Sequence, residues 1–135
     1  MKIALIGYGK MGKAIEQIAL NSGHSILHKV YSPESLSSLL KSKPDLAIEF
    51  TQPESAVSNI TYCLENNITV ISGTTGWQED YQKVADLCDK NKGTFLYASN
   101  FSIGVNLFFE FKKWVASKMS HMDFTTSMTE IHHNE

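Results

Sequence analysis

The 135-residue sequence lacks an excess of charge, a long apolar run and a set of clustered cysteines. Its 12 basic and 14 acidic residues give a net charge of -2 with no block of like charge, so the electrostatic signature of a nucleic-acid or anionic-membrane binder is missing. No apolar stretch approaches the roughly 18 residues needed to span a bilayer, and the apolar run 3–6 is too short for a secretory signal. We therefore expect a cytoplasmic protein with no nucleic-acid or membrane partner.

Several kinds of reactive site are also missing. The cysteines Cys63 and Cys88 form no C-x-x-C motif and have no Cys/His ligand spacing, so we expect both to be reduced packing residues. A Gly-x-Ser-x-Gly nucleophile elbow is absent, which argues against hydrolase chemistry. One adjacent histidine pair, His132 and His133, offers too few ligands for a metal ion, and we predict no metal site.

What the sequence contains is an alternation of short apolar or β-branched runs with segments of helical period, the pattern of a parallel sheet covered by helices. Strands are predicted at residues 2–7, 25–31, 46–50, 68–72 and 94–97. Helices are predicted at residues 10–21, from 33 to the stop at Pro44, and at 53–66, 78–92 and 103–120. A polar, threonine-rich segment, 123–133, suits one more strand. The fold class is therefore α/β, a Rossmann-like doubly wound parallel sheet followed by the first strand of a second domain.

A glycine motif lies between the first predicted strand and the first predicted helix. Residues 7–12, Gly-Tyr-Gly-Lys-Met-Gly, match Gly-x-Gly-x-x-Gly in the context that the dinucleotide-binding motif requires. In this motif Gly7 permits the tight turn, Gly9 leaves room for a pyrophosphate, and Gly12 lets the helix pack closely. The helix start would hold the diphosphate with its backbone N–H groups. The alternative is a glycine-rich turn that binds nothing.

The acidic residue that usually follows this motif about 20 residues later, where it binds the ribose of NAD, is missing. Without a carboxylate there is no repulsion of a 2′-phosphate, and His28, Lys29 and Ser32 could donate to one. NADPH is therefore at least tolerated, unless these residues are merely a solvated strand end. The same absence argues against a third candidate class, a methyltransferase binding S-adenosylmethionine.

Three further loops follow the predicted third, fourth and fifth strands. They are Phe50-Thr51-Gln52-Pro53, Gly73-Thr74-Thr75-Gly76 and Ala98-Ser99-Asn100-Phe101. Because the carboxyl ends of parallel strands share one edge of a sheet, we expect these loops and the glycine motif to surround one crevice. Glycines flanking small hydroxyl residues would let a flat ring approach and leave the hydroxyls free, although an ordinary turn explains the same spacing.

The segment Glu130-Ile131-His132-His133 offers the other candidate for chemistry. Imidazole titrates near physiological pH, so a histidine here suits a general acid or an orienting donor. Neighbouring side chains on a strand point to opposite faces, so at most one of the two histidines faces a given cleft unless the strand ends there. Histidines near a chain end that have no role are the alternative.

In this order the signatures resemble those of the dihydrodipicolinate reductase family, also called 4-hydroxy-tetrahydrodipicolinate reductases, of lysine and diaminopimelate biosynthesis. The matching stretches are residues 6–12, 49–54, 73–76, 98–106 and 130–133. The resemblance implies an NAD(P)-binding Rossmann domain, here residues 1–120, and a second α/β domain that binds substrate and forms a homotetramer, of which residues 121–135 would be the start. It also implies a hydride donor, NADH or NADPH, and a cyclic dicarboxylic hydroxy-imine as the small-molecule substrate.

The resemblance also implies roles for single residues. His132 would be the proton donor and His133 a substrate-binding residue. The cofactor-binding positions, those of the glycine motif included, would be Gly7, Gly9, Lys10, Met11, Gly12, Phe50, Thr51, Gly73, Thr74, Thr75, Ala98, Asn100 and Phe101. The lysine and Asp-Ala-Pro-Ser-Gly-Thr stretch of relatives would begin after Glu135, so we expect a chain truncated after the Glu-His-His motif. Two hypotheses follow: a reductase whose activity in this short form is in question, or a stand-alone, non-catalytic dinucleotide-binding domain.

Overall fold

The computed structural model of the chain describes residues 1–123 together with 125, 127 and 129. It divides into two compact units, Met1–Ser99 and Asn100–Glu135. The first unit contains a five-stranded sheet with its helices, and the described part of the second contains one long helix. The strand predicted at 123–133 includes residues outside the described set. It stays a prediction, as does the domain boundary at residue 120.

The elements follow one another in the predicted order, with small differences at their ends. The strands are β1 Lys2–Ile6, β2 Ser25–Val30, β3 Leu46–Glu49, β4 Val70–Ser72 and β5 Phe95–Tyr97. The α-helices are α1 Lys10–Asn21, α2 Ser38–Ser42, α3 Pro53–Glu65, α4 Tyr81–Lys90 and α5 Ile103–Met119. Two short 3-10 helices, η1 Pro33–Ser37 and η2 Gln78–Asp80, occupy positions predicted as the first turns of α-helices. Both precede the α-helix directly, as 3-10 turns commonly do at helix starts.

All strand pairs are parallel, in the order β2-β1-β3-β4-β5. The chain moves outward from β1 in one direction to reach β2 and in the other to reach β3, β4 and β5. The point where the direction reverses therefore lies between β1 and β3, where open α/β sheets bind their ligands. The predicted Rossmann-like fold class is confirmed for the first unit.

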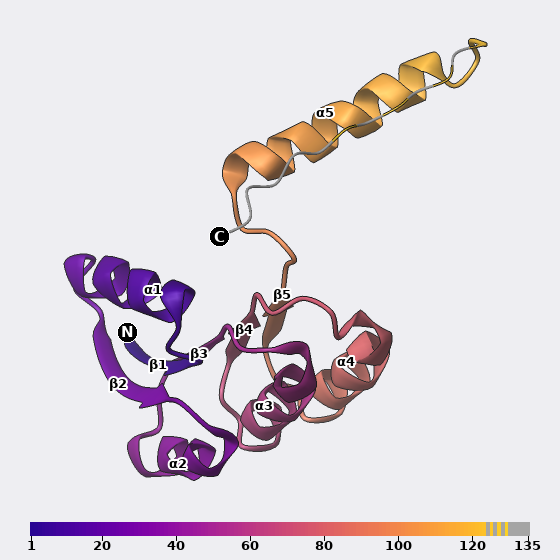
Figure 1. Cartoon of the computed structure of the whole chain (residues 1–135). Coiled ribbons are helices and arrows are strands. Elements are labelled where there is room, and N and C mark those ends of the chain that lie inside the picture. The colour runs from indigo at the N-terminus through magenta and orange to yellow at the C-terminus, as the bar shows by residue number, and fades with distance from the viewer. Residues whose placement is uncertain (124, 126, 128, 130–135) are drawn as a thin grey trace. The chain divides into compact units, whose positions relative to one another are not determined.

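Two apolar layers cover the sheet, and β1 contributes to both. Ala4 and Ile6 belong to the larger core cluster, with buried side chains from α2, α3 and α4 such as Leu39 and Ile60. Ile3 and Leu5 point to the other face, where they pack with Ala19 of α1. Figure 1 shows α1 on one side of the sheet and α2, α3 and α4 on the other. This alternation along β1 is what a strand buried on both faces requires.

Helix α1 has the predicted bounds but a narrower buried face than its apolar pattern predicts. Ala19 is buried and Ile15 is partly buried, whereas Met11 and Ile18 are 50% and 67% exposed. The helix packs against β1 and β2, and its outer apolar positions face solvent.

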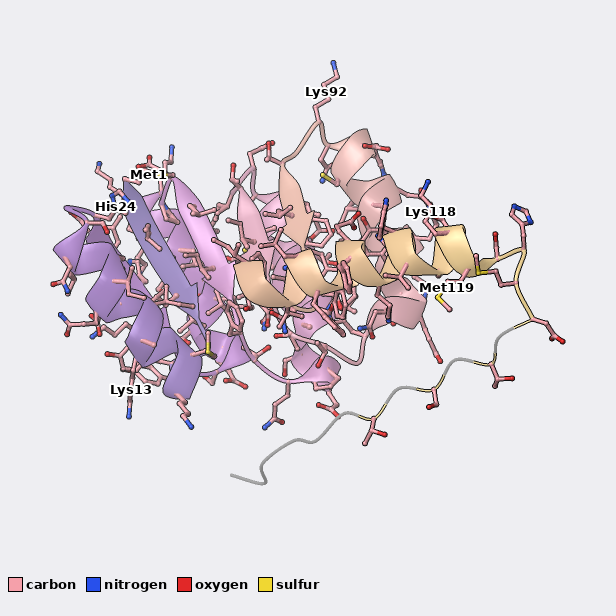
Figure 2. All side chains as sticks on the ribbon, turned by 90° about the horizontal axis from the view of Figure 1, so that it is seen from above. Met1, Lys13, His24, Lys92, Lys118 and Met119 are labelled. Carbon is pink, nitrogen blue, oxygen red and sulfur yellow. The ribbon has the colours of Figure 1, made fainter. Side chains whose placement is uncertain are left out.

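The amino ends of the strands mark the edge of the sheet opposite the loops of interest. Met1, His24 and Lys92 precede β1, β2 and β5, and Figure 2 shows the three along one edge. Lys13, in the first turns of α1, lies toward the other edge (Figure 2). The loops that leave the carboxyl ends of the strands are thus gathered on the side where α1 begins.

The second unit contains α5, which begins after Ser102, whose hydroxyl accepts a hydrogen bond from the backbone N–H of Val105. No residue of α5 is buried, and Leu107, Phe111 and Trp114 are among its exposed large side chains. Within the described part of the chain, no helix has both the length and the apolar character needed to cross a membrane.

Candidate functional site

A cavity of about 430 Å³ opens at the carboxyl ends of β1, β2 and β3, the predicted place. It is formed by the end of β1 and the glycine turn, by the end of β2, and by the β3–α3 loop with the first turns of α3. The lining residues are Ile6, Gly7, Gly9, Val30, Tyr31, Ser32, Phe50, Thr51, Gln52, Ser55 and Asn59. The cavity has room for part of a dinucleotide at the switch point of the sheet.

The three glycines of the motif have different geometric surroundings, and each explains the absence of a side chain in a different way. Gly7 has φ +89°, and a Cβ placed there would lie 1.9 Å from the carbonyl oxygen of Phe50. A Cβ on Gly12 would lie 2.4 Å from the carbonyl oxygen of Gly7, so the glycine closes α1 onto the turn rather than onto the strands. Gly9 lines the cavity, as Gly7 does, but differs from both other glycines because a Cβ there would meet nothing within 4 Å. Packing alone therefore does not require a glycine at position 9, and the missing side chain leaves space in the cavity.

The amino end of α1 faces the same cavity. Gly9 is its N-cap residue, and it has no side chain to bond the N–H groups of the first turn. First-turn N–H groups have no partner inside a helix, and the helix dipole favours an anion near them. A phosphate or pyrophosphate in the cavity would supply the missing cap.

The β2 side of the cavity is built from buried Val30 and two exposed residues. Tyr31 and Ser32 line it directly, and the Tyr31 ring packs edge-on against Tyr8 of the glycine turn with centroids 5.5 Å apart. No carboxylate is among the lining residues. Ser32 thus stands where the sequence predicts a donor to a 2′-phosphate.

The expected donor Lys29 is engaged elsewhere. Its ammonium group lies 2.8 Å from a carboxylate oxygen of Glu16 on α1 and 3.2 Å from the hydroxyl of Tyr8, which donates to the same carboxylate. The hydrogen bond from Lys29, followed by that from Tyr8, lowers the pKa of Glu16, and the Glu16 partner raises that of Lys29. Lys29 is not among the residues that line the cavity. The sequence correctly placed Lys29 near this end but did not reveal its acidic partner.

The β3 side is more tightly packed. The Phe50 ring lies against Gly73, where an added Cβ would be 2.2 Å from ring carbons, while the Phe50 backbone lies against Gly7. The expectation of free threonine hydroxyls is wrong at Thr74, which is 6% exposed. Its hydroxyl accepts from the backbone N–H of Thr51 at 2.8 Å and donates to Glu49 at 2.9 Å. Thr74 therefore supports the cavity wall from behind.

The remaining predicted cofactor residues do not line the cavity. Lys10 and Thr75 are exposed, as is Met11. The backbone N–H of Ala98 donates to the carbonyl of Ser72 at 3.3 Å, at the end of β5. Asn100 and Phe101 belong to the second unit, where the side-chain oxygen of Asn100 accepts from the Ser102 N–H at 2.7 Å. The Glu130, His132 and His133 positions lie outside the described residues.

Sequence reasoning missed two lining residues on α3, Ser55 and Asn59. They are four residues apart, and Asn59 is only 2% exposed. A polar pair at helical spacing beside the apolar residues Ala56 and Ile60 is the signal that could have found them, because it turns polar groups toward the sheet.

Burial beside this wall also affects a cysteine. Cys63 of α3 is fully buried, and burial together with the negative charge of Glu49 raises the pKa of its thiol to about 12. Cys88 is half-buried, and both thiols are free, as predicted. Among the described residues no group of three or more His, Cys, Asp or Glu side chains is arranged to hold a metal ion.

The parallel sheet, the glycine turn and the cavity at the switch point define a Rossmann-like nucleotide-binding class of domain. The family described as dihydrodipicolinate reductase, N-terminus, matches residues 1–101, and the chain belongs to this family.

Similar proteins agree with this assignment. The chain is 45% identical over 134 residues to the 4-hydroxy-tetrahydrodipicolinate reductase of Christiangramia forsetii, covering 98% of this chain and 56% of that protein. It is 34% identical to the enzyme of the same name from Carboxydothermus hydrogenoformans, covering 83% of this chain and 41% of that protein. Among solved structures, the dipicolinate-bound dihydrodipicolinate reductase from Paenisporosarcina sp. TG-14 superimposes with a TM-score of 0.71 at 27% identity, covering 87% of this chain and 54% of that one. The chain thus spans about half the length of these relatives.

Proposed function

We propose that the protein reduces 4-hydroxy-tetrahydrodipicolinate to tetrahydrodipicolinate in lysine and diaminopimelate biosynthesis, with residues 1–120 acting as the NAD(P)-binding domain. Membership of the reductase family supports the reaction class. The observation that supports coenzyme binding is the cavity beside Gly9. The fold would tolerate a side chain at this position, yet the glycine leaves the space open. A reduced nicotinamide coenzyme, NADH or NADPH, would supply the hydride.

The residues of this chain would divide the work. The glycine turn and the first turn of α1 would hold the pyrophosphate, Tyr31 and Ser32 would contact the adenosine ribose, and the Phe50 and Thr51 wall would contact the coenzyme further along. We propose that the other sequence-predicted cofactor residues join this site. They are Lys10, Met11, Gly12, Gly73, Thr75, Ala98, Asn100 and Phe101, with Thr74 as a support. His132 would deliver the proton and His133 would bind the substrate.

Both coenzymes are compatible with the β2 side of the cavity. A carboxylate that would repel a 2′-phosphate is missing from the lining, and Ser32 can donate a hydrogen bond. The ammonium group of Lys29 is held by Glu16 at 2.8 Å, so it adds less to a 2′-phosphate than the sequence predicts. We therefore propose binding of both NADH and NADPH.

A non-catalytic dinucleotide-binding domain is the second candidate. It is favoured by the cavity itself, whose lining residues account for coenzyme binding and include no histidine or carboxylate for proton transfer. The two candidates share the cofactor site and differ in turnover.

Calorimetric titration of the chain with NADH and NADPH, followed by a turnover assay with the product of dihydrodipicolinate synthase, separates the candidates. Binding with turnover supports the reductase, and binding without turnover supports the binding domain. Binding of neither nucleotide would contradict both candidates.

For the whole protein we propose a homotetramer in the cytoplasm, tested by light scattering and cell fractionation.

A further inference from the structure

Glu49 is the last residue of β3, and its side chain is fully buried at the end of the sheet. A carboxylate in such a place is costly unless its oxygens receive hydrogen bonds. Here three hydroxyl groups donate to it: Thr51 and Thr74 to one oxygen, at 2.9 Å in the case of Thr74, and Ser72 to the other. None of the roles proposed above uses this carboxylate.

The directions of these hydrogen bonds are determined by the neighbouring groups. The Thr74 hydroxyl oxygen accepts from the backbone N–H of Thr51 at 2.8 Å, so its single hydrogen is available for Glu49. The Thr51 hydroxyl oxygen accepts from the side-chain amide of Asn59 at 3.3 Å and likewise donates to Glu49. Both threonines therefore donate to Glu49, where one carboxylate oxygen accepts from both, and the other acceptor near Thr51, the Gln52 carbonyl oxygen at 3.5 Å, is more distant.

This arrangement joins two loops that come from different strands. Thr51 follows β3 and lines the cavity, whereas Thr74 follows β4 and lies behind it. Thr74 is also fixed at its carbonyl oxygen, which accepts from the indole N–H of buried Trp77 at 2.7 Å. The position of Thr51 thus depends on Thr74, and the orientation of both hydroxyls depends on Glu49.

We propose that Glu49 is a positioning residue for the coenzyme pocket, acting through Thr51 and Thr74 to hold the β3 and β4 loops together as one wall. The proposal rests on the proposed function, because the ligand of this wall is the dinucleotide. Glu49 does not line the cavity, so it would act on the coenzyme through its neighbours rather than by contact. Its contribution lies in the acceptor geometry at one oxygen rather than in its negative charge.

Two substitutions separate acceptor geometry from charge. Glu49→Gln removes the charge, but its amide oxygen can accept from both threonines while its NH₂ group donates to the Ser72 hydroxyl, which can rotate. Glu49→Leu removes the charge and every acceptor at similar volume. We expect Glu49→Leu to weaken NADH affinity about tenfold, and Glu49→Gln to stay within about threefold of wild type.

A second pair of variants tests the same link from the other loop. Thr74→Val removes the hydroxyl that joins Thr51 to Glu49, and we expect the loss seen in Glu49→Leu. The double variant that combines Glu49→Leu with Thr74→Val should bind NADH about as weakly as either single variant, because both substitutions break the same connection. Ser72→Ala is the matched control, since it removes a donor from the same carboxylate without disturbing the threonine link, and its affinity should remain within about threefold.

Amide hydrogen exchange provides a measurement without nucleotide. The Thr51 N–H should be protected in wild type and Glu49→Gln and should exchange faster in Glu49→Leu, while core amides such as Ile48 keep their protection. If Glu49→Leu fails to fold, Thr74→Val and Glu49→Gln still carry the test.

The outcomes are distinct. Unchanged NADH affinity in Glu49→Leu and Thr74→Val, with normal wild-type binding, would overturn the positioning role alone. Equal losses in Glu49→Gln and Glu49→Leu would also overturn it, because charge rather than acceptor geometry would then matter. Failure of the wild-type chain to bind either nucleotide would overturn the proposed function and the coenzyme role of Glu49 together.

Discussion

The two walls of the cavity hold their polar groups in opposite ways. On the β3 and β4 side, Glu49 is fully buried and receives three hydroxyl donors, while Phe50 is packed against two glycines. On the β2 side, Tyr31 is 71% exposed, and the ion pair of Lys29 and Glu16, outside the cavity lining, is partly exposed. A buried network has one satisfied arrangement, whereas an exposed pair can exchange partners with water. We infer that the first wall determines shape and the second adjusts selectivity.

The largest expected effect comes from breaking the packed wall at the glycine turn. In Gly7→Ala the new methyl group would lie 1.9 Å from the Phe50 carbonyl oxygen, at a residue whose φ is +89°. Left-handed strain and overpacking together should cost about 2 to 5 kcal/mol of unfolding free energy. Urea denaturation measures this cost, and a loss below about 1 kcal/mol would show that the turn relaxes easily.

An intermediate effect is expected from pH, again on the packed side. The pKa of the Cys63 thiol is raised to about 12 from an ordinary value of 9.0, so the unfolded chain loses this proton first as pH rises. The stability that the neutral thiol contributes is therefore fully present below pH 9 and is lost as pH rises toward 12, at up to about 1.4 kcal/mol per pH unit.

The non-titrating variant Cys63→Val isolates this effect. Unfolding free energies of both proteins, measured from pH 7 to 10.5, should show wild type losing stability relative to Cys63→Val only above pH 9. Parallel curves over this range would contradict the assigned burial. Thiol labelling of the native wild type should modify Cys88 before Cys63, since Cys88 is only half-buried.

The smallest effect is expected at the exposed wall. Glu16→Gln removes the partner that holds Lys29 at 2.8 Å and so releases the ammonium group toward a 2′-phosphate. NADPH affinity should rise about twofold to threefold relative to NADH, with little change in stability, because water screens the charges of a solvent-accessible ion pair. Asp80→Asn, which breaks the Lys83 pair of η2 and α4, is the matched control and should leave the ratio unchanged. An unaltered affinity ratio in Glu16→Gln would show that Lys29 does not contribute to coenzyme selectivity.

The same contrast explains what the sequence could predict. Helix α1 begins and ends at the predicted residues because a glycine turn and an apolar period both mark it. The cavity position followed from parallel strand order, and Gly7, Gly9, Phe50 and Thr51 were all predicted to be part of it. These features depend on local pattern or on topology.

The role of Glu49 could not be predicted in this way. It ends a short strand, where an acid usually reaches solvent, and its partners Ser72 and Thr74 come from the next strand and loop. The pairing of Lys29 with Glu16 likewise joins residues of β2 and α1 that no sequence period connects. In both cases the contacts that determine the environment of the residue are tertiary, so the linear sequence pattern does not predict them.

The most direct test of the central claim compares two glycines. A Cβ on Gly9 or on Gly23 would meet nothing within 4 Å, but Gly9 lines the cavity and has φ -84°, whereas Gly23 has φ +77°. Calorimetry with NADH and NADPH, paired with urea denaturation, should show that Gly9→Ala weakens binding about tenfold or more while stability changes little. Gly23→Ala should lose about 1 to 2 kcal/mol of stability and keep its affinity. Unchanged nucleotide affinity in Gly9→Ala would contradict a pyrophosphate site at the glycine turn.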